Sequence, residues 1–120
     1  PPMSVIELIR HQQQHYARFH RSPANLRLHL VAVPMFQAGT LLLLLGRSWW
    51  LALAGIGVMT LSLALQRRGH QWEDEAVEPF RGPLNALLRI GFEQWLSFPR
   101  FVLQGGWRLA LGKLNQEAKR

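Results

Sequence analysis

Residues 28–66 read LHLVAVPMFQAGTLLLLLGRSWWLALAGIGVMTLSLALQ, and Arg47 is the only formally charged residue among them. Arg47 divides this segment into two uncharged runs of nineteen residues, Leu28 to Gly46 and Ser48 to Gln66. Nineteen helical residues reach about 28 Å, close to the thickness of the hydrocarbon core of a bilayer. The pattern predicts two membrane-spanning helices, at about residues 28–46 and 48–66.

A soluble hairpin of two buried helices is the alternative, but a chain of 120 residues has too little other sequence to cover two helices that are apolar on every side. The joint at Gly46-Arg47 is short, so the two helices must run antiparallel, with both outer ends on one side. Six arginines flank those outer ends: Arg18, Arg21, Arg27, Arg67, Arg68 and Arg81. The positive-inside rule therefore predicts that both termini are cytoplasmic.

The remaining sequence predicts helices that flank this hairpin. Ser4 and Glu7 have the spacing of a capping box, whereas Ser22 followed by Pro23 is typical of the start of the helix that runs through Asn25 and His29 into the first span. Residues 84–96 are amphipathic, whereas Pro99 and Gly105-Gly106 are expected to break the C-terminal region into short pieces. We expect a single all-α domain over residues 1–120: a small integral membrane helical bundle, with a two-span hairpin and amphipathic or re-entrant helices on either side.

Composition excludes several classes of function. The chain has no cysteine, which rules out disulfides, thiolate metal sites and cysteine nucleophiles. Its net charge of +7 suggests a small soluble nucleic-acid binder, but only 18% of the residues are charged and 10% are aromatic. The two long uncharged runs argue against that class, and we expect membrane lipid rather than nucleic acid as a partner.

Histidines supply the best candidates for chemistry. His29 enters the first span and His70 leaves the second, so an antiparallel hairpin places them at the same depth and lets them share a ligand. His20 precedes the turn at Ser22-Pro23 and can fold back over this pair. Polar residues accompany the histidines at helical spacing, namely Asn25, Gln66 and Glu73. Three imidazoles with an adjacent carboxylate can form a site for Fe(II), Mn(II) or Zn(II).

Each of these residues also has a simpler interpretation. A histidine near a membrane interface is commonly an interfacial polar residue, and we favour this interpretation for His11 and His15, despite their i, i+4 spacing. Glu73 can equally be a solvated charge or a partner of neighbouring arginines. Asn25 and Gln66 can pair helices through hydrogen bonds, or can orient ligating imidazoles from outside the metal shell.

At these positions the sequence resembles the 2-hydroxy-fatty-acid dioxygenase family, the fungal-type enzymes and their bacterial relatives. The resemblance rests on Tyr16-x-x-x-His20-Arg21-x-x-x-Asn25-x-x-x-His29, a hydrophobic hairpin, and then Gln66-x-x-Gly69-His70-x-x-Glu73. Three later pieces match one bacterial branch of the family: Glu78-Pro79-Phe80-x-Gly82-Pro83, Glu93-Gln94, and Phe98-Pro99-Arg100-Phe101-Val102-Leu103. Together the matches extend from about Tyr16 to Trp107.

The resemblance implies an integral enzyme of the bacterial inner membrane, with a cytoplasmic active site. Such an enzyme uses Fe(II) and O2, without 2-oxoglutarate, to shorten a 2-hydroxy fatty acid by one carbon. It also implies that His20, His29 and His70 are the iron ligands, with Glu73 the next candidate, as ligand or catalytic base.

Arg100 is a candidate partner for the carboxylate of the fatty acid, although it can also simply contact lipid phosphates. A non-enzymatic membrane scaffold or assembly protein with incidental histidines is the alternative function. The sequence leaves open whether the chain forms a homo-oligomer.

Overall fold

The computed structural model describes residues 3–118, and every regular element in that range is helical. The α-helices are α1 (Val5–Phe19), α2 (Pro23–Leu45), α3 (Trp49–His70), α4 (Pro83–Phe92), α5 (Phe98–Phe101) and α6 (Trp107–Ala118). Two π-helical turns, η1 (Glu93–Ser97) and η2 (Val102–Gly106), join the last three of these. The predicted all-α class is confirmed for the described residues.

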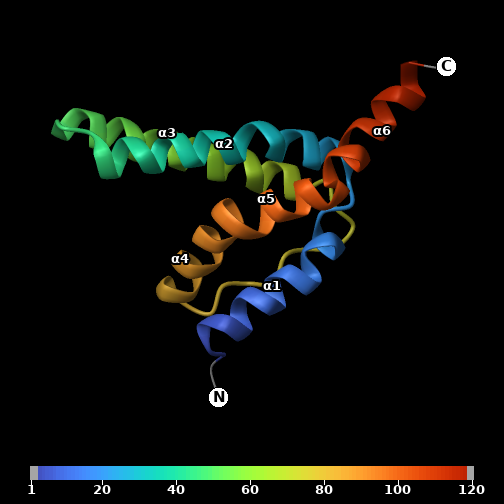
Figure 1. Cartoon of the computed structure of the whole chain (residues 1–120), viewed down its shortest axis with the longest axis horizontal. Coiled ribbons are helices and arrows are strands. Elements are labelled where there is room, and N and C mark those ends of the chain that lie inside the picture. The colour runs from blue at the N-terminus through green and yellow to red at the C-terminus, as the bar shows by residue number, and fades with distance from the viewer. Residues whose placement is uncertain (1–2, 119–120) are drawn as a thin grey trace.

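The long apolar helices α2 and α3 form the predicted antiparallel hairpin (Figure 1). Their backbones are in close contact where two glycines face each other. A Cβ atom on Gly55 would lie 2.5 Å from the carbonyl oxygen of Gly39, so a larger residue does not fit there. Both helices are long and apolar enough to cross a membrane. As the Ser22-Pro23 pair predicts, α2 begins at Pro23, where the Ser22 hydroxyl accepts a hydrogen bond from the Asn25 N–H, and α3 continues beyond the predicted span to His70.

Helix α1 begins with the predicted capping box. The Ser4 hydroxyl accepts from the Glu7 N–H at 3.2 Å, and the Glu7 carboxylate accepts from the Ser4 N–H at 3.1 Å. The helix ends at Phe19, so only His20, Arg21 and Ser22 separate it from α2. This tight joint holds His20 next to the start of α2, as the turn at Ser22-Pro23 predicts.

The C-terminal region corrects one prediction, because Pro99 does not break its helix. The π-turn η1 precedes it, and there the Phe98 N–H bonds to the Glu93 carbonyl, five residues back. Proline lacks an N–H, and its ring collides with the carbonyl four residues back in an α-helix. The wider π-turn accommodates both defects. The chain does bend at Gly105, whose φ of 115° is in the left-handed region that favours glycine.

Helices α1 and α4 lie on the same side of the hairpin, and residues 71–82 connect α3 to α4 between them (Figure 1). Side chains hold this connector in place. Arg18 on α1 forms an ion pair with Glu75. The Arg89 guanidinium on α4 donates to the carbonyls of Glu78 and Pro79, at 2.8 and 2.9 Å. These contacts fix the connector to α1 and α4, so it is not a free loop.

Candidate metal centre

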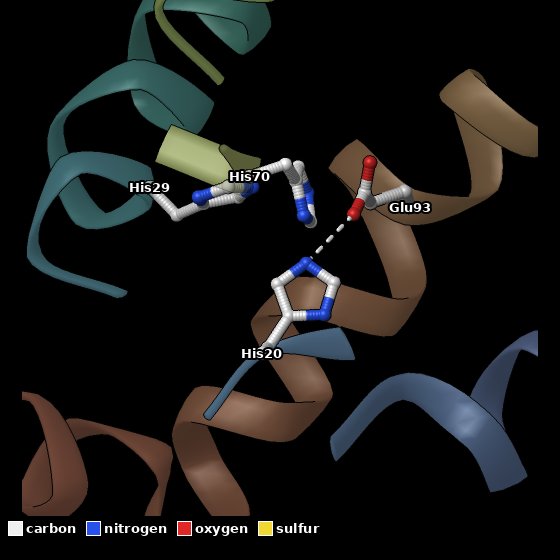
Figure 2. A group of neighbouring side chains, drawn as sticks. All are labelled: His20, His29, His70 and Glu93. Atoms are coloured by element: carbon white, nitrogen blue, oxygen red, sulfur yellow. Dashed lines mark ion pairs between the residues drawn. The ribbon is translucent and has the colours of Figure 1, made fainter. Parts of the chain in front are cut away.

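Four side chains converge at the open end of the hairpin: His20, His29, His70 and Glu93, called the ligand group below. Each offers one nitrogen or oxygen atom, and these atoms all lie within 4.8 Å of one another. Figure 2 shows the three rings and the carboxylate directed toward a common centre. The rings stand nearly perpendicular to each other, with centroids 4.6 to 5.1 Å apart. Four separate parts of the chain supply them.

Backbone carbonyls orient two of the imidazoles. The Nδ1 of His20 pairs with the Tyr16 carbonyl at 2.8 Å, and the Nδ1 of His29 pairs with the Asn25 carbonyl at 3.0 Å. A carbonyl only accepts, so each Nδ1 donates its N–H to the backbone, which leaves the Nε2 of each ring for another partner. Both Nε2 atoms are buried without a hydrogen-bond partner. Metal-binding histidines use one nitrogen for the metal and donate the other ring N–H to a carbonyl or carboxylate in this way.

Glu93 was not among the site residues predicted from the sequence. Its Oε2 lies 3.3 Å from the Nε2 of His20, and the carboxylate is mostly buried. Burial alone would raise the pKa of Glu93, but its pairing with His20 outweighs burial and lowers that pKa. The group is therefore an anion at neutral pH. One signal existed: Glu93 is the only acidic residue between Pro83 and Gln116.

A network of amides holds Glu93 in position. Gln94, the next residue, is fully buried, and its side chain exchanges two hydrogen bonds of 2.8 Å with the side chain of Gln66 on α3. Gln37 on α2 donates to the Gln94 carbonyl, also at 2.8 Å. Gln66 therefore pairs with Gln94, the residue after Glu93, rather than with one of the histidines. Through Gln94, η1 is tied to both helices of the hairpin.

Glu73 lies outside the ligand group. Its carboxylate accepts hydrogen bonds from the Arg21 and Ser22 N–H groups and from the Asn25 side chain, at 2.6 to 3.1 Å. Negative charge at the start of α2 is favourable for the helix dipole. Gly69 leaves room for this arrangement, because a Cβ there would lie 2.2 Å from the Asn25 Oδ1. Glu73 and Asn25 together fix the turn that carries His20 and His29.

A cavity of about 1130 Å³ opens beside the ligand group. His20, His70 and Glu93 form part of its wall, and residues of α1, α3, α4 and the connector form the rest. The apolar side chains along it include Leu8, Phe19, Leu63, Val77, Phe80, Leu84, Leu88 and Ile90. The cavity can therefore hold a long apolar molecule with one end at the ligand group.

The structure does not bring the other predicted residues to the ligand group. Arg100 is exposed on α5 and is not among the residues that line the cavity. His11 and His15 do line it, but they belong to a separate contact in which the His11 Nε2 lies 3.3 Å from Glu78. Arg67, which was counted only as a flanking charge, lines the cavity one helical turn before His70.

Comparison with known proteins agrees with this geometry. Residues 6–100 match the Mpo1-like family, described as 2-hydroxy-palmitic acid dioxygenase Mpo1-like. The chain belongs to this family. No curated protein and no solved structure matches the chain. The match of the Mpo1-like family includes all four residues of the ligand group, and the resemblance noted in the sequence is confirmed.

Proposed function

We propose that this chain is an Fe(II)-dependent dioxygenase that shortens 2-hydroxy fatty acids by one carbon. The observation that carries the proposal is the ligand group itself: inward nitrogens from three histidines and one carboxylate, at the wall of an apolar cavity. Imidazole and carboxylate ligands suit Fe(II), and four of them leave positions open for further ligands. Fe(II) bound there would supply the activation of O2.

His20, His29, His70 and Glu93 are the proposed ligands. The sequence pointed to Glu73 as the acid, as ligand or base, but its carboxylate accepts hydrogen bonds from three donors at the α1–α2 turn. Glu93 is therefore our candidate for the carboxylate at the metal, and Glu73 supports the site through Asn25. Asn25 orients His29 through its carbonyl, while Gln66 acts on Glu93 through Gln94.

The substrate class follows from the cavity. A 2-hydroxy acid carries a hydroxyl and a carboxylate on adjacent carbons, so its two oxygens can reach one metal ion while the alkyl chain occupies the apolar space. Water that hydrates such a chain is released on burial, which favours binding. For the carboxylate we propose Arg67 in place of Arg100, because Arg67 lines the cavity and Arg100 does not.

We further propose that α2 and α3 span the membrane with the ligand group at the cytoplasmic side. Their length and apolar composition support this placement. Arg67 and Arg68 follow the apolar part of α3 at the end where the ligand group lies, which agrees with the positive-inside rule. A fatty acid could then enter the cavity directly from the lipid.

Metal analysis of the purified protein tests the proposal. We expect about one iron per chain, release of a product one carbon shorter from 2-hydroxypalmitate under O2, and loss of both in His29→Ala and His70→Ala variants. A protein without stoichiometric metal, or one whose histidine variants behave like the wild type, would instead support the membrane scaffold.

A further inference from the structure

Tyr16 carries a buried hydroxyl for which packing alone gives no reason. Its side chain is only 5% exposed and belongs to an apolar cluster with Val33 and Phe98. Its hydroxyl has no hydrogen-bond partner among the described residues. Leaving such a group unpaired is unfavourable, and phenylalanine would fill the same space without that cost. A buried tyrosine hydroxyl normally has a partner, so its partner here is to be sought in a ligand.

The position of Tyr16 indicates which chemical group of a bound molecule could be the partner of its hydroxyl. Its ring stacks on His20, with centroids 3.7 Å apart and planes within 7°, and it lines the cavity. Burial raises the pKa of the phenol, and the neighbouring Glu93 carboxylate raises it further through its charge and as a nearby acceptor, although the two groups do not meet hydrogen-bonding geometry. The hydroxyl therefore lies near the Glu93 carboxylate, on a residue that lines the cavity beside the ligand group.

A phenol donates a hydrogen bond and a carboxylate only accepts one. A carboxylate of a substrate has no proton to donate to Glu93 at this position, whereas a neutral hydroxyl can satisfy both residues at once. It can accept from Tyr16 and donate toward Glu93. A hydrogen atom in place of that hydroxyl can do neither, and it would leave the phenol buried and unpaired.

We propose that Tyr16, with Glu93, recognises the 2-hydroxyl of the fatty acid and so distinguishes 2-hydroxy acids from unsubstituted acids of equal length. This inference rests on the proposed function and deepens it, because it assigns a specificity-determining residue to the same cavity. Tyr16 holds the hydroxyl carbon beside the metal site and takes no part in binding the metal.

Binding measurements on the iron-loaded protein in detergent micelles, without O2, test this assignment. Titration calorimetry would give the Kd of 2-hydroxypalmitate and of palmitate for the wild type and for Tyr16→Phe. The phenylalanine keeps the ring that stacks on His20. We expect the wild type to prefer the 2-hydroxy acid, and Tyr16→Phe to weaken its binding about fivefold to tenfold while the Kd of palmitate stays unchanged.

Metal content separates this result from other roles. Tyr16→Phe is expected to hold the same iron per chain as the wild type. Loss of iron in Tyr16→Phe, equal weakening of both acids, or an unchanged preference would each overturn the assignment while leaving the proposed function intact. A wild type that holds no iron and does not distinguish the two acids would overturn both.

Discussion

The side chains of Gln66 and Gln94 form a reciprocal amide pair, in which each Nε2 donates to the Oε1 of the other at 2.8 Å. The pair is buried and joins α3 to the π-turn that begins with Glu93. In an apolar surrounding, two amides that satisfy each other give a defined register between the segments that carry them. The Glu93 carboxylate is thus positioned by a contact between two residues that are not themselves proposed metal ligands.

Replacing one member of this pair should therefore weaken metal binding from outside the metal shell. Gln66→Leu leaves the Gln94 amide buried and unpaired, which should lower the free energy of unfolding by about 1–3 kcal/mol. Metal affinity should fall roughly tenfold or more, as for other groups that support ligands. Thermal unfolding and metal titration would measure both.

The double variant Gln66→Leu/Gln94→Leu is the control, since it removes both amides and should recover part of the lost stability. Stability losses that simply add would show that the two side chains do not act as a pair.

Gly69 offers a second test, because its missing side chain makes room for Asn25. A Cβ at this position would lie 2.2 Å from the Asn25 Oδ1, so Gly69→Ala should displace Asn25 from Glu73 and disturb the carbonyl that orients His29. We expect a loss of about 1–3 kcal/mol in stability and a lower metal content.

Gly57 on the same helix provides the matched control, since no atom lies within 4 Å of a Cβ built there. Gly57→Ala should retain the metal and lose no stability, because alanine favours a helix more than glycine does. Equal behaviour of the two alanine variants would contradict the role given to Gly69.

Local signals explain what could be predicted from the sequence. The capping box at Ser4, the Ser22-Pro23 start and the Gly46-Arg47 joint each depend on residues a few positions apart, and the structure has all three. A short joint then forces α2 and α3 to be antiparallel, which is why His29 and His70 could be placed together. These inferences needed no knowledge of how α4 packs.

Glu93 and Gln94 show what local signals could not supply. Their place in the site depends on how the chain after the connector folds back over the hairpin, and on a π-turn that shifts the register of side chains around the helix. Glu73 has helical spacing to His70, but the helix ends at His70 and the turn that follows directs the carboxylate to the start of α2. Spacing alone did not distinguish the two acids.

Metal removal should destabilise the fold if the ligand group binds a metal in the native state. Without a metal, three imidazoles and a carboxylate from four segments lose their shared partner, so chelation should lower the melting temperature. Restoring Fe(II) should raise it again in the wild type. The His29→Ala variant should show no response to either treatment.

His11→Ala is the comparison for that experiment, because His11 lines the same cavity but pairs with Glu78 rather than with the ligand group. It should keep the wild-type response to chelator and metal. A wild type whose melting temperature ignores both treatments would argue against a bound metal.

The two candidate arginines for the substrate carboxylate can be separated by kinetics. Arg67 lines the cavity one turn before His70 and forms no ion pair among the described residues. Arg67→Gln should raise KM for a 2-hydroxy fatty acid about tenfold, since a hydrogen bond to a charged group contributes about 1.5–3 kcal/mol, and should leave the iron content unchanged. Arg100→Gln changes an exposed residue outside the cavity and should leave KM unaffected. A raised KM in Arg100→Gln with an unchanged KM in Arg67→Gln would instead assign the substrate carboxylate to Arg100. The substrate would then have to approach from the face of α5.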